Sequence, residues 1–376
     1  MLKIIKLMKT NRIFFKLFLS LLVFVLLFIF SFKLNYFIAY THHKILIFTI
    51  LKTISLIISV FAFLSFSFYF SNIFSSKIIK NITISIFSIL LFFSIMEIIF
   101  TFYTPSTNVF TDLSNKIWQK KYWKPINSLG YRDVEPNEKP DKKNILVIGD
   151  SFVAGQGVKY EEVFSSILRK ELRQQYNVYN LGVCGSHTER EYDSLLTYPV
   201  KPDIIILGYY HNDIESAMIK HNIHSKFSNP KNKLSPFSKF IIDNSLFFNF
   251  LFSIKAKSQI SAEFMESEQN DILLYLNDDI WNTQKQSLKK FKEYCLENNV
   301  KLIILFIPGL GEGIAFTNVI AGKKIEEFCR EENIEFINIY PYIKNLPISK
   351  RIANKFDQHP SSEVHKIIAK KLLTQL

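Results

Sequence analysis

The first 104 residues of this 376-residue chain contain neither glycine nor proline. All 11 glycines fall between Gly130 and Gly322. Because glycine and proline mark turns and break helices, the chain divides near residue 104. The N-terminal part is compatible with uninterrupted helix, and the C-terminal part has the turn residues that an α/β domain needs. We expect a membrane anchor over 1–103, a connector over 104–143, and a folded domain over 144–376 with an insert at about 214–280.

Three apolar stretches lie within the predicted anchor, at 17–32, 54–74 and 82–103. A helix of about 20 residues crosses the ~30 Å hydrocarbon core of a bilayer, so the second and third are long enough. The first can extend back to Ile13 if the Lys16 side chain reaches the interface. A cleaved signal peptide is the alternative for this stretch, but the residues after Phe32 offer no small-residue cleavage site. We therefore favour three transmembrane helices.

Basic residues flank these stretches in a pattern that predicts a cytoplasmic N-terminus. With three crossings, everything after Tyr103 lies outside the cytoplasm, on the periplasmic side of the inner membrane; with two crossings it would be cytoplasmic. Glu97, near the end of the third stretch, is expected to reach the outer headgroup region without a role. The basic residues are Lys3, Lys6, Lys9, Arg12 and Lys16 before the first stretch, and Lys77 and Lys80 between the second and third.

The net charge of +13 does not indicate a nucleic-acid partner, because the lysines and arginines are scattered and many flank apolar runs. Three cysteines (Cys184, Cys295 and Cys329) form no CxxC pair and no metal-ligand spacing. We expect no disulfide framework, with a single bridge as the alternative, and neither a metal nor a cofactor. In the connector, Trp118 and Trp123 lie among lysines, which suits either a membrane interface or packing on the domain surface.

From residue 144 onward, short apolar runs alternate with amphipathic helices. We expect strands at 144–148, 178–181, 203–207, 301–307 and 334–339. Continuous apolar runs are typical of strands covered on both faces, so the alternation predicts a parallel sheet between two helical layers. Ligands bind to such sheets beyond the carboxyl ends of the strands.

Reactive side chains occur where these strands end. Ser151 directly follows the first strand, so its hydroxyl and its backbone N–H are expected at the sheet edge. Gly185 follows the second strand and Asn212 the third; a bare backbone N–H and a side-chain amide can both stabilise an oxyanion. The motif Asp357-Gln358-His359-Pro360 is expected at the end of the fifth strand. There His359 would take the proton of Ser151, with Asp357 fixing the tautomer.

These blocks resemble the SGNH, or GDSL, hydrolases, over residues 144–376. The matching patterns are "GDSF…G.GV", "N.G..G", "KPD….ND" and "D.HP", and residues 127–133 look like the lead-in of bacterial members. The resemblance implies a flavodoxin-like three-layer α/β/α sandwich. It also implies Ser151 as nucleophile, Ser151, Gly185 and Asn212 as oxyanion donors, and His359 as base. Many members place the acid three residues before the histidine, whereas Asp357 is two before. A backbone carbonyl is the alternative partner for His359.

Four other residues near these blocks receive no catalytic role. His187 and His211 are interpreted as loop-packing residues, since a base must reach the Ser151 hydroxyl. His365, on the last helix, is expected to face solvent. Cys184 is interpreted as a small buried residue, because no group that would activate it is visible.

The insert contains a Phe-rich stretch at 237–252. It is interpreted either as an acyl-binding lip or bilayer-facing surface, or as a helix that closes the core. The functional hypothesis is a serine esterase, namely a deacylase or acetylesterase acting on an acylated envelope glycan or lipid. The alternatives are an O-acyltransferase that works with a multispanning membrane acyl donor, and a catalytically silent glycan-binding or scaffold domain.

Overall fold

The computed structural model describes residues 2–40, 45–73, 76–102, 107–108, 111–136, 142–224 and 230–376. Parts of the predicted connector, at 104–106, 109–110 and 137–141, lie outside the described residues. The chain forms two compact units. The first comprises residues 1–120 and 230–256, and the second comprises residues 121–229 and 257–376. Residues 230–256, which belong to the predicted insert, thus group with the N-terminal helices.

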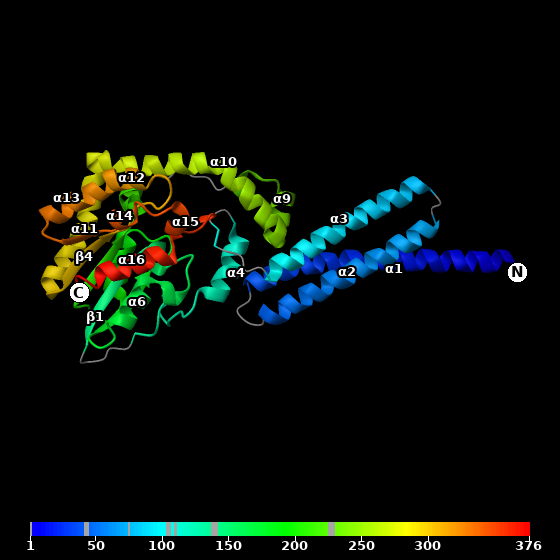
Figure 1. Cartoon of the computed structure of the whole chain (residues 1–376), viewed down its shortest axis with the longest axis horizontal. Coiled ribbons are helices and arrows are strands. Elements are labelled where there is room, and N and C mark those ends of the chain that lie inside the picture. The colour runs from blue at the N-terminus through cyan, green and yellow to red at the C-terminus, as the bar shows by residue number, and fades with distance from the viewer. Residues whose placement is uncertain are drawn as a thin grey trace. The chain divides into compact units, whose positions relative to one another are not determined.

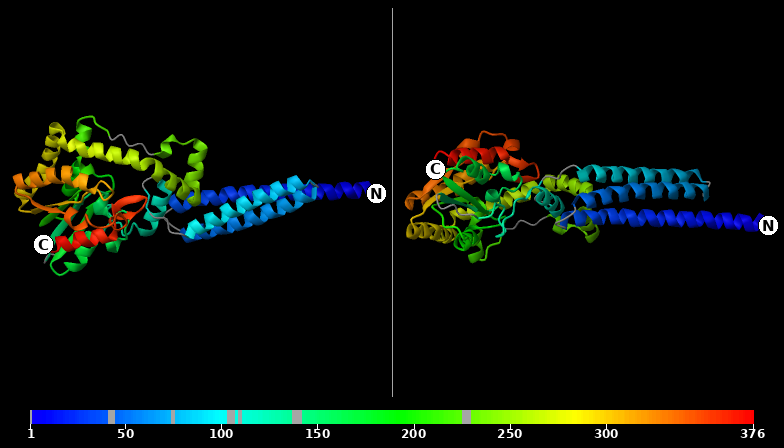
Figure 2. Two further views of the ribbon diagram at one scale, coloured as in Figure 1. Left: turned by 45° about the horizontal axis from the view of Figure 1, so that its top comes forward. Right: turned by 90° about the horizontal axis from the view of Figure 1, so that it is seen from below.

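Three long helices, α1 (Leu2–Tyr40), α2 (Ile45–Ile73) and α3 (Lys77–Phe102), dominate the first unit and run side by side (Figures 1 and 2). Each contains a segment long and apolar enough to cross a membrane: Asn11–Asn35, Ile47–Ser71 and Lys77–Phe102. The absence of glycine and proline explains why these helices continue without a break. Their outward faces expose large apolar side chains, such as Phe18, Phe61 and Phe68, as expected of surfaces that meet lipid rather than water.

Three shorter segments complete the first unit: most of α4 (Asp112–Tyr122), all of α9 (Pro236–Asn244) and the beginning of α10 (Leu246–Leu273). The Phe-rich stretch lies here. The ring of Phe247 contacts those of Phe93 and Phe100 on α3, with centroids 6.0 and 5.6 Å apart. The interpretation as a helix that closes the core of the second unit is therefore wrong for this residue. Trp118, on α4, is buried.

Glu97 does not reach the headgroup region as an unengaged side chain, and that prediction is wrong. It is 2% exposed and forms an ion pair with Lys52 of α2, which is fully buried, at 2.7 Å. Two long apolar helices can hold such charges only when they neutralise each other and find further hydrogen-bond partners.

The second unit is built on a five-stranded parallel sheet with the order β2-β1-β3-β4-β5. This confirms the predicted α/β class, and each strand lies within a few residues of its predicted position. The strands are β1 (Lys143–Gly149), β2 (Tyr176–Gly182), β3 (Ile204–Tyr209), β4 (Lys301–Phe306) and β5 (Glu335–Asn338).

Helices cover both faces of this sheet. Alternate residues of β1 show the division, since Leu146 and Ile148 join one core while Ile145 and Val147 join the other. The first core includes side chains from α7 (Thr188–Thr197), α8 (Glu215–Lys220), α11 (Asp278–Asn298) and α13 (Lys323–Glu331). The second includes side chains from α5 (Ser151–Ala154), α6 (Phe164–Glu171), α14 (Tyr340–Ile343) and α16 (Ser362–Leu372). Burial on both faces explains the continuous apolar runs in the strands.

Smaller elements connect these layers. They are η1 (Tyr160–Glu162), η2 (His211–Ile214), η4 (Leu274–Leu276), α12 (Ile314–Thr317), η5 (Asn318–Gly322) and α15 (Ile348–Arg351). The short helix η3 (Pro230–Lys233) belongs to the first unit. A two-stranded antiparallel ribbon, β6 (Ile352–Asn354) and β7 (Asp357–Pro360), precedes α16. The expectation that Asp357 and His359 end the fifth strand is therefore wrong, because β5 ends at Asn338 and these residues form their own ribbon.

Candidate active site

Ser151 is the first residue of the four-residue helix α5, directly after β1. Asp150 caps this helix: its side chain accepts the backbone N–H of Phe152 at 2.8 Å. Aspartate is a favoured N-cap because its carboxylate satisfies an amide that has no partner within the helix. Ser151 thereby lies at the carboxyl edge of the sheet, 9% exposed, with its own N–H at the helix N-terminus.

Three glycines allow α5 to lie close against the sheet. Gly149, Gly182 and Gly208 are register partners on β1, β2 and β3. A Cβ at Gly149 or Gly208 would lie 2.4 Å from the side chain of Val153, and one at Gly182 would lie 2.2 Å from the Ala154 backbone nitrogen. The glycines therefore position the nucleophile by letting its helix approach, a role that the sequence pattern did not reveal.

Arg132 holds the turn after Ser151 from below. Its side chain is 2% exposed and its guanidinium donates to the backbone carbonyls of Ala154, Gly155 and Val158, at 3.1, 2.6 and 2.8 Å. The guanidinium also lies 4.5 Å from the ring centroid of Trp123. Burial lowers the pKa of Arg132 to about 10, so the side chain remains a cation at neutral pH. The sequence singled out residues 127–133 only by resemblance, and the structure supplies the physical reason.

Asp133 performs a similar task for the second strand. Its carboxylate accepts the backbone N–H of Asn180 at 2.8 Å and the hydroxyl of Tyr160 at 2.9 Å, and it forms an ion pair with Arg169. The Asn180 side chain in turn donates to the carbonyl of Val153 at 2.9 Å. Arg132 thus fixes the loop after β1, and its neighbour Asp133 fixes β2.

Asp357 and His359 lie on β7, with one residue between them. Side chains two positions apart in a strand point to the same side, which explains why a spacing of two brings this acid to this histidine. The Nδ1–H group of His359 donates to the Asp357 carboxylate, which is fully buried. The same carboxylate accepts the backbone N–H of His359 at 3.1 Å. Gln358, between them, points the other way and is exposed.

The structure brings Ser151 and His359 into direct contact. The Ser151 hydroxyl donates to Nε2 of His359 at 2.8 Å, which is the geometry that a nucleophile and its base require. Desolvation lowers the pKa of His359, but the Asp357 carboxylate outweighs this effect and raises the pKa above its usual value. Burial raises the pKa of Asp150 to about 6. The ring of Phe152, 5.2 Å from that of His359, packs beside the imidazole.

The three predicted oxyanion donors follow three neighbouring strands. Ser151 follows β1, Gly185 lies in the loop after β2, and Asn212 lies in η2 after β3. Gly185 is exposed and has a φ of +72°, with open space where a Cβ would lie. Asn212 is half-buried, and its side chain lies close enough to Asp150 to oppose the rise in the pKa of that carboxyl group.

No protein-family model matches the chain, and no curated protein matches it in sequence. Several solved structures are similar to it. A member of the lipolytic G-D-S-L family from Veillonella parvula is 14% identical, with 62% of this chain and 97% of that chain covered and a TM-score of 0.38. A carbohydrate acetylesterase family member from Sinorhizobium meliloti is 13% identical, with 62% and 96% covered and a TM-score of 0.36. An acetyl-xylooligosaccharide esterase from Geobacillus is 14% identical, with 63% and 95% covered and a TM-score of 0.37.

Two observations decide the fold. One is the strand order β2-β1-β3-β4-β5, and the other is the position of the sequence blocks on neighbouring strand ends and on the ribbon before α16. The second unit is a flavodoxin-like three-layer α/β/α sandwich, and we call it the SGNH unit because its sequence blocks resemble those of the SGNH hydrolases. In this SGNH unit, Ser151, His359 and Asp357 form a continuous hydrogen-bonded series. Of the residues predicted to have no catalytic role, Cys184 lies near this series, since the carboxylates of Asp150 and Asp357 affect its pKa.

Among those residues, two expectations are wrong. His365 does not face solvent: it is fully buried, its Nδ1 accepts the N–H of Phe164 at 3.4 Å, and burial lowers its pKa to about 3. Cys184 is exposed rather than buried. Desolvation by the surrounding loops and the carboxylates of Asp150 and Asp357 raise the pKa of its thiol to about 12. A thiol with such a pKa is a poor nucleophile at neutral pH.

The other two histidines predicted to have no catalytic role lie at helix starts, His187 directly before α7 and His211 at the start of η2. His211 is buried, and burial lowers its pKa to about 3. His187 precedes α7, and its pKa is also lowered, first by desolvation. Both are therefore neutral at pH 7. Within the described ranges, no group of three or more His, Cys, Asp or Glu side chains is arranged to hold a metal ion.

A pair of buried acids beneath the site was not predicted. Glu191 of α7 and Asp213 of η2 are 1% and 0% exposed, and Asp213 accepts the backbone N–H of Tyr210 at 2.8 Å. Burial, followed by the charges of neighbouring carboxylates, raises the pKa of each well above its usual value. Carboxyl groups buried near each other cannot all remain ionised, so this environment favours the protonated form. Sequence offers little signal for it, since the partners are 22 residues apart on different elements.

Proposed function

We propose that the SGNH unit is a serine ester hydrolase that works through an acyl-enzyme on Ser151. The observation that carries this proposal is the 2.8 Å hydrogen bond from Ser151 to Nε2 of His359, whose Nδ1–H is held by the buried carboxylate of Asp357. A serine hydroxyl is a weak nucleophile unless a base takes its proton, and this geometry provides that base.

The reaction proceeds in two steps. In the first, Ser151 Oγ bonds to the ester carbonyl carbon, His359 takes the Oγ proton, and the tetrahedral oxyanion meets the donors at Ser151, Gly185 and Asn212. His359 then gives the proton to the departing alcohol as the ester C–O bond breaks. In the second step, water attacks the acyl-enzyme by the same route and releases the acid. Each oxyanion donor contributes about 2.7–4 kcal/mol in the transition state.

For the substrate, we propose an acylated glycan or lipid of the cell envelope, with a small acyl group such as acetyl. The support is the first unit, whose three helices are long and apolar enough to cross a membrane. We further propose that the N-terminus is cytoplasmic, because basic residues precede the first span, and that the SGNH unit lies outside the cytoplasm. The second candidate, which these helices favour, is acyl transfer. A membrane-bound donor would supply the acyl group, and an acceptor hydroxyl would take it from Ser151 in place of water.

Turnover of an acetyl ester by the full chain in detergent tests the proposal. We expect release of free acetate that Ser151→Ala abolishes, and that Ser186→Ala, a change at a buried serine in the neighbouring loop, leaves intact. Cleavage of the ester only when a sugar alcohol is present, with the acetyl group recovered as the ester of that alcohol and not as free acetate, would identify a transferase. If Ser151→Ala keeps its turnover, or no ester is cleaved with or without acceptors, the proposal fails and a scaffold role takes its place.

A further inference from the structure

The chain breaks its helix between α9 and α10, next to the membrane helices. α9 ends at Asn244, α10 begins at Leu246, and Ser245 between them is extended, with φ −124° and ψ 123°. A break of this kind leaves carbonyl groups at the end of one helix, and N–H groups at the start of the next, without partners inside either helix.

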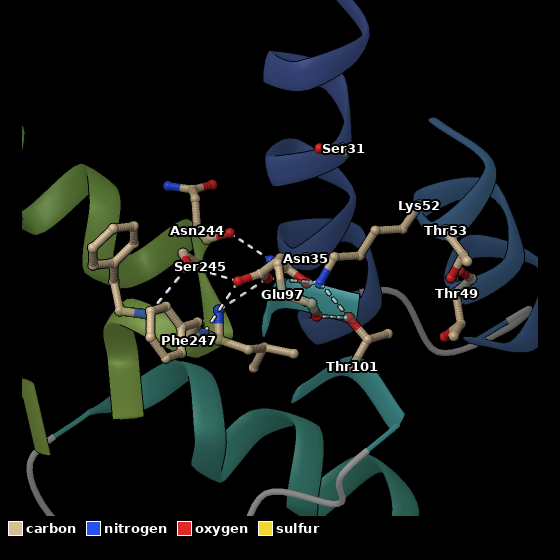
Figure 3. A network of polar contacts seen from close by, with 12 residues as sticks. Ser31, Asn35, Thr49, Lys52, Thr53, Glu97, Thr101, Asn244, Ser245 and Phe247 are labelled. Atoms are coloured by element: carbon tan, nitrogen blue, oxygen red, sulfur yellow. Dashed lines mark hydrogen bonds and ion pairs between the residues drawn. The ribbon is translucent and has the colours of Figure 1, made fainter. Parts of the chain in front are cut away.

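Side chains from α1 and α3 supply the missing partners (Figure 3). The Glu97 carboxylate accepts the N–H groups of Leu246 and Phe247, each at 3.1 Å, and the Ser245 hydroxyl at 2.7 Å. Glu97 therefore caps α10 from a different helix. The side-chain amide of Asn35 donates to the Asn244 carbonyl at 2.5 Å, so the end of α9 is also satisfied.

The same cluster is neutral overall. Lys52 of α2 donates to Glu97 at 2.7 Å, to the Asn35 side-chain oxygen at 2.7 Å and to the Thr101 hydroxyl at 2.6 Å. Asn35, Lys52 and Glu97 come from three different helices, and each is 2% exposed or less. Figure 3 shows their polar groups converging on the break.

The break lies at membrane depth. Asn35, Lys52 and Glu97 all fall inside the segments that can span a bilayer. Glu97 is five residues before the end of α3, or about 7.5 Å inside it at 1.5 Å per residue. The Phe247 ring lies 6.1 Å from that of Phe92, still further from the end of α3.

Large apolar side chains are exposed on both sides of the break, and the nearby Asp243 is neutralised by an ion pair with Lys231. Phe237 and Phe240 on α9 are 72% and 48% exposed, and Leu251 and Ile254 on α10 are 41% and 44% exposed. No charged residue occurs from 244 to 254. The polar residues of this part of α10 turn inward: Asn249 accepts hydrogen bonds from Thr111 and Ser114, and Ser253 accepts one from Asn108.

We propose that α9 and residues 246–256 of α10 form a fourth membrane-embedded element, a helix–break–helix that enters one leaflet and leaves on the same side. The outer surface of this element contacts the hydrocarbon of the bilayer, as do the outer surfaces of α1–α3. Backbone breaks are tolerated at this depth only where protein groups replace water, and the Asn35–Lys52–Glu97 cluster is such a replacement. The element also ties the SGNH unit to the membrane, because the chain leaves that unit after residue 229 and returns at 257. This proposal does not depend on whether Ser151 is catalytic.

Spin labels in reconstituted vesicles test the insertion. In a Cys184→Ser background, whose remaining cysteines are buried, we would label Phe240→Cys and Leu251→Cys with a nitroxide. Lipid-facing Ile89→Cys on α3 and Leu296→Cys on α11 of the SGNH unit serve as the membrane and water controls; both parent residues are exposed. We expect residues 240 and 251 to relax with oxygen rather than with an aqueous nickel complex, as residue 89 does. Relaxation with nickel, as at 296, or protection from both reagents would overturn the proposal.

A charge-balance series tests the cluster itself. Lys52→Met leaves the Glu97 carboxylate without its cation, so we expect faster proteolysis within 230–256 in vesicles. Adding Glu97→Gln to Lys52→Met should restore part of the protection, since glutamine carries no charge and its one carbonyl oxygen still accepts from residue 246 or residue 247. Equal protection of the wild type and Lys52→Met, or no recovery in the double variant, would contradict a neutral cap at membrane depth.

Discussion

Replacing Asp357 with asparagine separates the charge of this residue from its shape. The carboxylate is buried, contacts Nδ1 of His359 and is the main reason that the pKa of His359 is raised. Asparagine can still accept a hydrogen bond from Nδ1 through its side-chain oxygen, but it carries no charge. The variant therefore keeps part of the orientation of His359 and loses the electrostatic stabilisation of the imidazolium.

Both the rate and its pH dependence should change. Positioned acid–base catalysis contributes about 10²–10⁴-fold, or about 2.7–5.4 kcal/mol at 1.36 kcal/mol per factor of ten. Since orientation is partly kept, we expect the lower end, about 10²-fold, in kcat/KM for an acetyl ester. His359 must be neutral to act as base, so wild-type activity rises as the pH passes its raised pKa. In Asp357→Asn, desolvation acts without the opposing charge, and this rise should move to lower pH.

The assay is kcat/KM for a chromogenic acetate ester across pH 5–9, with the full chain in detergent. Gln358→Ala is the matched control, because its side chain lies between the two residues but on the other side of β7. It should leave both the rate and the pH profile in place. An Asp357→Asn variant with wild-type activity, or with its rise shifted to higher pH, would refute the reasoning and favour a backbone carbonyl as the partner of His359.

Three further predictions follow from the site. Arg132→Met should lower the free energy of unfolding by more than ~4 kcal/mol, because several buried carbonyls lose a charged donor. The thermal unfolding temperature and ester turnover should fall together. Retained turnover in a folded variant would contradict the role of Arg132 in holding the turn after Ser151. Glu191→Gln should flatten the pH dependence of stability. Acids with raised pKa values stabilise the fold below their unfolded values near 4, and this contribution is lost as pH rises through the raised values. An unchanged pH profile of unfolding would contradict a raised pKa for Glu191. Gly182→Ala should abolish turnover, since the new Cβ would clash with the Ala154 backbone. Gly185→Ala, with open space but a positive φ, should cost only about 1 kcal/mol of stability. Equal tolerance of both variants would show that α5 is not held by the glycines at the strand ends.

The parts of the SGNH unit that follow from local pattern were predictable. Apolar runs such as 144–148 correspond to strands because both faces of the sheet are covered, and the order of the blocks placed Ser151 at a strand end. His365 could have been placed by the same kind of pattern, since it follows Val364 on the buried face of α16, four residues before Ala369. Its polar side chain instead led to the wrong expectation of solvent exposure.

The parts that depend on contacts between distant segments were not predictable. Nothing in the spacing of Asp357 and His359 reveals a ribbon, yet the ribbon is what makes a spacing of two effective. Arg132 reaches carbonyls more than 20 residues away, and Lys52 finds Glu97 on another helix. Sequence indicates that a buried charge needs a partner, but only the packing of the helices identifies which residue that partner is.

The most direct test of the central claim is intact-mass analysis of the full chain after treatment with a fluorophosphonate, which reacts with serines whose hydroxyl is activated by a base. We expect one adduct, mapped to Ser151 by peptide sequencing, that is lost in Ser151→Ala and strongly slowed in His359→Gln. No adduct on the folded protein, an adduct on a different serine, or labelling that is indifferent to His359→Gln would contradict the account of Ser151 and His359 as nucleophile and base.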